Sequence, residues 1–357
     1  MKKRVIAMHL PQFYPFKEND EWWGKGFTEW RNVANARPRF RGHYQPHIPS
    51  DLGFYDLRLK ECRLEQQKLA REYGIDGFCY YHYWFNGHLI MEKPVEGHLA
   101  DKEETLPFMF CWANEDWHRN WAGDFNETLI SHTYSKEDDV AHFNYLLPFF
   151  KDERYIKVNG RPVFAIYRAD FVPDIDAMIS TFQECAAKEG FSIYFIKVEG
   201  RDKSPLPASM DAMMEFAPFN TSRNFEKFWH HPFESFCRRV LHVNYGKQLY
   251  SYKKYIKDIA AKPKTDVKTF PSVFPSWDNA SRRVGQQFLA FKGSTPKLFE
   301  NLFGMVYDSF TPYSEEENFV FINAWNEWAE GNHLEPDLKW GRGYLEAISK
   351  VVNKSQQ

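Results

Sequence analysis

The chain has 357 residues, 43% of them hydrophobic and 26% charged, which is the composition of an ordinary globular protein. Its formal net charge of −2 argues against a nucleic acid partner, because binding to a phosphate backbone requires a basic surface. The aromatic share of 18% exceeds what a core requires, and since sugar rings and nucleobases both stack on aromatic side chains, a neutral ring-shaped ligand is favoured.

The N-terminal segment, MKKRVIAMHLPQF, starts with basic residues, but only six apolar or near-apolar residues follow before Pro11. This run is too short for the apolar region of a signal peptide or for a membrane span. We therefore expect a buried first strand and a cytoplasmic protein without a membrane span. The five cysteines are scattered and show no C-x-x-C spacing, which is typical of free thiols in a reducing compartment. They are Cys62, Cys79, Cys111, Cys185 and Cys237.

Short apolar runs alternate with amphipathic stretches along the chain. Strands are predicted at 4–10, 75–81, 106–112, 162–167, 192–198, 211–216, 269–274 and 319–323. Helices are predicted at 55–74, 135–150, 174–190 and 294–310. Eight strand-then-helix units predict an α/β fold, a (β/α)8 TIM barrel with elaborated βα loops. A doubly wound open sheet is the alternative, but the sequence contains neither G-x-G-x-x-G after the first strand nor G-x-x-x-x-G-K-[ST].

The length is compatible with two average domains or with one large barrel. No low-complexity linker, charge block or internal repeat marks a boundary, so we expect a single catalytic domain over residues 1–357. The stretch 218–248 is long for a simple βα connection. We predict that it is a loop insertion over the active site.

Polar and aromatic residues gather after the carboxyl ends of the predicted strands, where barrel enzymes carry their active sites. Strings such as YYHYWFNG (80–87) and CWANEDWHRNW (111–121) combine rings that stack on sugars with groups that bond hydroxyls. Aromatic core packing is the alternative interpretation of these strings. The predicted substrate-binding residues are Gln12, Tyr14, Trp30, Tyr81, His82, Trp84, Trp112, Asn114, Glu115, Trp277, Asp278, Trp325, Asn326 and Glu335.

The histidines near this rim, His43, His47, His82 and His118, are too dispersed in sequence to predict a metal site. A polar lining for a sugar is the favoured interpretation, and we expect no metal and no cofactor. The D-x-D sequence at 174–176 resembles a metal–nucleotide-sugar motif, but it follows a proline and opens a helix. Helix capping explains it better.

Near the C-terminus, NAWNEWAEGNHLEPD (323–337) sets Glu327, Glu330 and Glu335 among two tryptophans, directly after a predicted buried strand. Apolar surroundings raise the pKa of a carboxyl group, which is useful in general acid catalysis. A helix start with acidic residues is the alternative.

Five strings, in order along almost the whole chain, resemble the WbsX-type proteins, labelled glycosyltransferases or lipopolysaccharide-biosynthesis proteins and related to glycoside hydrolase family 99. These strings are LPQFYPFKENDEWWGKGFTEWRNVANARPRFRGHYQPHIPSDLGFYDLR, YGIDGFCYYHYWFNG, CWANEDWHRNW, PSWDNASRR and NAWNEWAEGNHLEPD. The resemblance implies a (β/α)8 barrel that acts on glycosidic linkages in bacterial surface or capsular polysaccharides.

Family 99 enzymes are retaining endo-acting α-mannosidases and α-mannanases with two glutamates in an E-W-x-E-G setting, which NEWAEG matches. The resemblance therefore implies that Glu327 and Glu330 are catalytic. Glu327 would deprotonate the 2-hydroxyl of the sugar, whose oxygen attacks the anomeric carbon, and Glu330 would protonate the leaving oxygen and then activate water. Ala329 stands where the mannosidase branch has a histidine, so the sugar stays open.

Three functions are compatible with these observations. The first is a retaining glycoside hydrolase of the family 99 type, which the barrel and the absence of nucleotide motifs favour. The second is a glycosyltransferase of lipopolysaccharide, O-antigen or capsule assembly. The third is a non-catalytic glycan-binding protein, which would need no paired carboxylates. In each case the expected partner is an oligosaccharide or polysaccharide.

Overall fold

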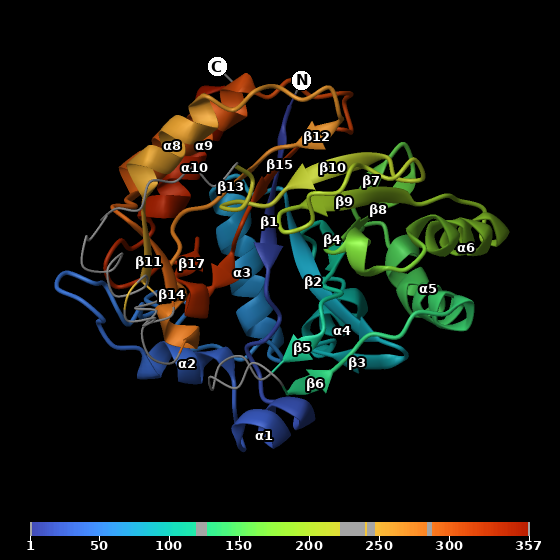
Figure 1. Cartoon of the computed structure of the whole chain (residues 1–357), viewed down its shortest axis with the longest axis horizontal. Coiled ribbons are helices and arrows are strands. Elements are labelled where there is room, and N and C mark those ends of the chain that lie inside the picture. The colour runs from blue at the N-terminus through green and yellow to red at the C-terminus, as the bar shows by residue number, and fades with distance from the viewer. Residues whose placement is uncertain (1, 119–126, 222–239, 241–246, 284–287, 356–357) are drawn as a thin grey trace.

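The computed structural model describes residues 2–118, 127–221, 240, 247–283 and 288–355. Its centre is a closed barrel of parallel strands, with helices packed around it (Figure 1). The barrel strands are β1 (Arg4–His9), β2 (Gly77–Phe85), β4 (Phe108–Trp112), β8 (Arg161–Ile166), β9 (Tyr194–Glu199), β10 (Ala212–Glu215), β12 (Thr269–Phe270), β13 (Ser272–Val273) and β15 (Phe319–Ile322). Every pairing between neighbours is parallel. The predicted (β/α)8 barrel is confirmed.

The seventh strand position shows why the barrel has an extra short strand. Strand β12 pairs with β10, while β13 pairs with β15, and Pro271 separates the two. Proline has no backbone N–H and cannot donate to a ladder, so it interrupts the strand predicted at 269–274. The Pro271 carbonyl still accepts a hydrogen bond from the Phe321 N–H (2.9 Å), which keeps the closure continuous.

Several helices around the barrel begin at residues whose side chains cap them. The side chains of Ser135, Asp174 and Thr295 accept hydrogen bonds from backbone N–H groups in the first turns of α5, α6 and α9. The D-x-D sequence at 174–176 is therefore a capping sequence, as predicted. The helices are α1 (Lys17–Trp23), α2 (Glu29–Asn35), α3 (Lys60–Glu72), α4 (Lys93–Ala100), α5 (Lys136–Lys151), α6 (Ile175–Lys188), α8 (Tyr252–Ala260), α9 (Pro296–Ser309) and α10 (Gly343–Lys354).

Short elements outside the barrel shape its loops. The strands β11 (Lys247–Ser251) and β14 (Phe288–Lys292) pair in parallel, and β16 (Asn326–Glu327) and β17 (Asn332–His333) form a small hairpin. Others are β3 (His88–Ile90), β5 (Trp117–His118), β6 (Thr128–Ile130), β7 (Lys157–Val158) and the 3₁₀ turns η1 (Ala169–Phe171), η2 (Asn279–Arg282) and η3 (Trp328–Glu330). The insertion predicted at 218–248 falls mostly outside the described residues. No helix in the described ranges is both long and apolar enough to cross a bilayer.

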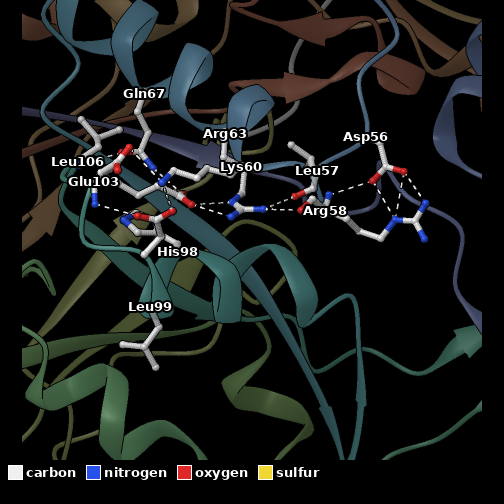
Figure 2. Close-up of polar contacts among 12 residues, drawn as sticks. Asp56, Leu57, Arg58, Lys60, Arg63, Gln67, His98, Leu99, Glu103 and Leu106 are labelled. Carbon is white, nitrogen blue, oxygen red and sulfur yellow. Dashed lines mark hydrogen bonds and ion pairs between the residues drawn. The ribbon is translucent and has the colours of Figure 1, made fainter.

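Helix α3 is anchored near the amino end of the barrel by a buried ion pair. The Arg63 guanidinium donates to Glu104 Oε1 through Nε (2.9 Å) and Nη2 (2.7 Å), and Gln67 donates to the other carboxylate oxygen (3.0 Å) (Figure 2). Gln67 also accepts from the Leu106 N–H just before β4, at the amino end of the barrel. In barrel enzymes this end carries stability, and the opposite end carries the chemistry.

Candidate active site

One arginine gathers three carboxylates at the carboxyl end of the barrel. Arg282, at the end of η2, lies 2.6 Å from Glu327 Oε2 through Nη2 and 2.8 Å from Glu330 Oε1 through Nη1. Its Nε lies 3.1 Å from Oε2 of Glu29, the first residue of α2. Glu29 and Glu327 are buried, whereas the Glu330 side chain is 20% exposed. Of the three carboxylates, Glu330 is therefore the most exposed to solvent.

The local chain path explains why Glu327 and Glu330 meet the same guanidinium. The hairpin strand β16 ends at Glu327 and the chain turns at once into the 3₁₀ turn η3, so residues three apart project to one side. Gly331 closes the turn with φ of 56°, and a Cβ there would meet Asp278 Cβ at 3.0 Å. This close approach lets the Asp278 N–H donate to the Glu330 carbonyl (2.6 Å). The PSWDNASRR loop therefore holds the NEWAEG hairpin in place.

The charges in this cluster do not balance. Three ionised carboxylates beside one guanidinium would leave a net charge of −2 in a mostly buried site. Burial raises the pKa of Glu327 to about 8, with Glu330 and Glu29 adding to the rise and Arg282 opposing it. Burial also raises the pKa of Glu29. We conclude that the carboxyl groups of the cluster share a proton near neutral pH, with Glu327 among its carriers.

Three tyrosines lie near enough to the pair to feel its charge, two on β2 and one directly after β8. The phenols of Tyr81 and Tyr83 lie on the barrel face of β2 and have raised pKa values because of burial, to which the Glu327 charge adds. Tyr167, after β8, has a pKa raised by burial and further by Glu330. Hydroxyl groups with suppressed ionisation remain hydrogen-bond donors and acceptors, as recognition of sugar hydroxyls requires.

Side chains alternate between the two faces of β2, so the other aromatic residues predicted there point away from this cluster. Successive side chains on a strand point to opposite faces, so His82 and Trp84 face the helices. Trp84 donates to Asp138 of α5 (3.0 Å) and stacks on His142 of the same helix. Trp112 is buried and donates to the Trp84 carbonyl (3.2 Å). The structure thus places His82, Trp84 and Trp112 between the barrel and α5, not beside Glu327.

Other predicted residues lie in the loops at the carboxyl end of the barrel. Glu115 pairs with Arg168 (2.8 Å) and Arg201 (3.5 Å). The Asn114 side chain bonds both backbone groups of Arg168, which joins the loops after β4 and β8. Trp277 is nearly buried and packs edge-on against Phe219.

The remaining rim predictions are buried polar or aromatic groups in local contacts. The Asp278 side chain accepts from Gln45 (2.9 Å) and contacts His43. Gln12 donates to Asn19 (3.5 Å). The Tyr14 hydroxyl accepts from the Lys93 N–H (3.4 Å).

A third group of predicted residues supports the β16–β17 hairpin. Glu335 is 1% exposed and accepts hydrogen bonds from Tyr55 (2.8 Å), Gln66 (2.7 Å) and the indole of Trp328 (2.5 Å). Burial raises the pKa of Glu335 to about 7. Since all its contacts are internal, this third glutamate fixes the hairpin and does not face the rim.

Three more predicted residues, one amide and two aromatic, lie in or near the β16–β17 hairpin and make only internal contacts. Asn326 bonds both the N–H and the carbonyl of Leu10, which ties the hairpin to the end of β1. Trp325 is fully buried against Phe78. Trp30 donates to the Tyr55 carbonyl.

Sequence reasoning missed Arg282, Glu29 and Tyr83. Arg282 lies in PSWDNASRR and Glu29 in GFTEWRN, two of the strings that stood out at the rim. Their pairing joins residues 253 positions apart, which no spacing rule predicts. Within the described ranges, one group of residues has atoms arranged for a metal ion, namely His47, His333 and Asp337.

Barrel enzymes carry their active sites at this rim, and enzymes that cleave glycosidic bonds use paired carboxyl groups, so the arrangement of Glu327 and Glu330 is compatible with an enzyme that acts on carbohydrates. The chain belongs to the family described as Glycosyltransferase WbsX, which matches residues 5–348. Two curated relatives, both named "Uncharacterized protein WxcX" and from two strains of Xanthomonas campestris pv. campestris, are 36% identical over 353 residues. That match covers 98% of this chain, and the chain spans about half the length of these relatives.

Solved structures support the same architecture. A "Glycoside hydrolase-like protein" aligns with a TM-score of 0.61 at 14% identity, covering 98% of this chain and 94% of that chain. The GH99 endo-alpha-mannosidase from Bacteroides thetaiotaomicron aligns with a TM-score of 0.60 at 16% identity, covering 99% and 97%. At such identity the likeness shows the fold. Together with the family, it supports a carbohydrate-active enzyme.

Proposed function

We propose that the protein is a retaining glycoside hydrolase that cleaves internal linkages of a bacterial surface polysaccharide with Glu327 and Glu330. The observation that carries this proposal is the shared contact of both glutamates with Arg282 at the barrel rim. A retaining reaction needs two carboxyl groups close together, one to assist attack and one to exchange a proton with the leaving oxygen.

The roles follow from burial. Glu327 is buried, and its pKa of about 8 makes its carboxylate a stronger base than an ordinary glutamate. It removes the proton from the 2-hydroxyl of the sugar, whose oxygen displaces the leaving group at the anomeric carbon and forms a 1,2-anhydro sugar. In the reacting state the shared proton of the pair lies on Glu330, the more exposed partner, which donates it to the leaving oxygen. Water then gives a proton to Glu330 and attacks the anomeric carbon, while the sugar oxygen recovers its proton from Glu327.

The paired glutamates can be tested with isosteric variants. Glu330→Gln removes the proton donor and should slow cleavage of natural linkages by a factor of about 10² to 10⁴. An aryl glycoside with a good leaving group needs less protonation, so its first step should be spared. Glu327→Gln should slow both substrates alike. If both variants keep wild-type rates on a substrate found by screening defined polysaccharides, the assignment is wrong.

The pH dependence tests how many protons the pair needs. The reaction requires Glu327 ionised and Glu330 protonated, a state in which the pair holds one proton. The rate should therefore fall above a pH of about 8, where the pair loses its last proton. A rate that keeps rising above that pH would contradict the proposed roles.

Glycosyl transfer is the second candidate, because the family carries the description Glycosyltransferase. A transferase of polysaccharide assembly would bind a nucleotide sugar as donor. Isothermal titration with several nucleotide sugars distinguishes the two functions, since the hydrolase should show no binding heat.

A further inference from the structure

A second polar site lies behind the catalytic hairpin. A cavity of about 120 Å³ is bordered by the loop after β1, by β14 and by the segment after β17. Its lining includes His47, His333 and Asp337, which are 8%, 1% and 2% exposed. The nitrogen and carboxylate atoms of these three residues all lie within 4.8 Å of one another. Two imidazoles and a carboxylate form a donor set that suits Zn²⁺ and similar ions.

The spacing of these atoms is close to that of a bound ion. His47 Nδ1 lies 2.9 Å from His333 Nε2, which lies 3.9 Å from Asp337 Oδ2. Zn²⁺ binds nitrogen at about 2.0–2.1 Å, so neighbouring ligands of a tetrahedral site lie about 3.3 Å apart. The two distances fall on either side of this value, and modest side-chain rotations would bring the atoms to it.

Outer contacts hold two of these ligands in the required orientation. His333 Nδ1 lies 2.9 Å from the Glu335 carbonyl, an acceptor that fixes the ring with its Nε2 lone pair toward His47. Asp337 Oδ1 accepts from the N–H groups of Lys339 (3.0 Å) and Trp340 (2.6 Å), while Oδ2 faces the cluster and also accepts from the Tyr44 hydroxyl (3.4 Å). Such partners are what metal ligands need to stay in place.

A buried histidine pair elsewhere provides a contrast. His82 Nε2 and His142 Nε2 lie 2.8 Å apart, as close as the pair behind the hairpin. That pair packs among aromatic rings, and no carboxylate joins it in a cluster within the described part of the chain. The third, anionic ligand distinguishes the site at Asp337.

We propose that His47, His333 and Asp337 bind one divalent transition-metal ion, for which Zn²⁺ is the probe, with a fourth position open to the cavity. The sequence analysis expected no metal because the histidines near the rim are dispersed along the chain, and His47 and His333 are 286 positions apart. The folded barrel brings the segment after α2 against β17.

The ion would stabilise the catalytic hairpin without touching its carboxylates. In the β16–β17 pairing His333 lies opposite Asn326, while Glu327 lies opposite Asn332, so His333 and Glu327 project from opposite faces. The His333 ring also stacks on Trp328 of η3, with ring centroids 3.8 Å apart. Fixing His333 therefore fixes the segment that carries Glu327. This role does not depend on the reaction proposed above.

The test uses the full chain, stripped with a chelator and titrated with Zn²⁺ by calorimetry and by elemental analysis after gel filtration. We expect one ion per chain, a raised unfolding temperature, slower amide hydrogen exchange across 326–337, and the visible absorption of a tetrahedral ion when Co²⁺ replaces Zn²⁺. Asp337→Asn keeps the shape and the Oδ1 contacts but loses the anionic ligand, so its affinity should fall at least tenfold.

His47→Gln provides a second ligand variant if Asp337→Asn does not fold, and it should also lose the ion. His142→Gln is the matched control, because it alters a buried histidine pair outside the cluster and should keep one ion per chain. Stoichiometric Zn²⁺ in Asp337→Asn and His47→Gln at wild-type affinity, or less than about a tenth of an ion in the wild type at micromolar Zn²⁺, would overturn the proposal.

Discussion

The buried carboxyl of Glu327 makes a quantitative prediction about stability. Its pKa is about 8 in the folded protein and 4.5 in an exposed glutamate. The folded state keeps the proton while the unfolded state releases it, so the stability present below pH 4.5 is lost as the pH rises toward 8. At pH 7 the loss is about 1.36 kcal/mol for each of 2.5 pH units, or about 3 kcal/mol.

Glu327→Gln keeps the shape but cannot ionise, so the variant should become more stable relative to the wild type as the pH rises. The difference in free energy of unfolding should grow by about 1.4 kcal/mol per pH unit between about pH 5 and pH 8. Urea unfolding followed by tryptophan fluorescence measures it at each pH. Glu65→Gln is the control, since that side chain is 61% exposed and the difference should stay flat. A flat or falling difference for Glu327→Gln would refute the reasoning.

Three further substitutions test the fold and the site by urea unfolding. Arg63→Met leaves Glu104 buried without its counter-charge and should lower the free energy of unfolding by about 3–5 kcal/mol. Arg58→Ala is the control, since it removes an exposed ion pair and should lower it by at most about 1 kcal/mol. Equal losses would contradict this reasoning. Arg282→Met should lower the free energy of unfolding by about 3–5 kcal/mol at pH 8, and by less at pH 5, where protonation neutralises the carboxylates. A loss that does not change with pH would be inconsistent with a shared proton. Trp84→Ala should cost about 3–5 kcal/mol, and a stable variant with weakened glycan binding would show instead that Trp84 lines the substrate site.

The fold was largely predictable, because the barrel strands are short apolar runs and amphipathic helices follow several of them. The interruption of the seventh strand at Pro271 and the full length of β2 were not predictable. The β2 strand extends to Phe85 because tyrosines face the barrel while His82 and Trp84 pack on α5, so both faces are buried. Since a strand buried on both faces has no polar side, composition alone gave no clear end point.

The candidate site was predictable only where its residues are adjacent in sequence. Glu327 and Glu330 stand three apart and meet in one turn. The partner that joins them, Arg282, comes from another loop, and the same holds for His47 opposite His333. The spacing of the aromatic residues near the rim does not show whether they bind sugar or pack in the core. A tryptophan that stacks on a sugar and one that packs against a helix look alike in sequence. Strand alternation separates them once the register is known.

The anomeric configuration of the first product tests the central claim most directly. Proton NMR would follow a defined surface oligosaccharide, identified by screening, immediately after addition of the enzyme. Paired action of Glu327 and Glu330 predicts that the newly formed reducing end first appears with the anomeric configuration of the substrate linkage, and that mutarotation follows later. An inverted first product, or turnover only when a nucleotide sugar is supplied, would contradict the account.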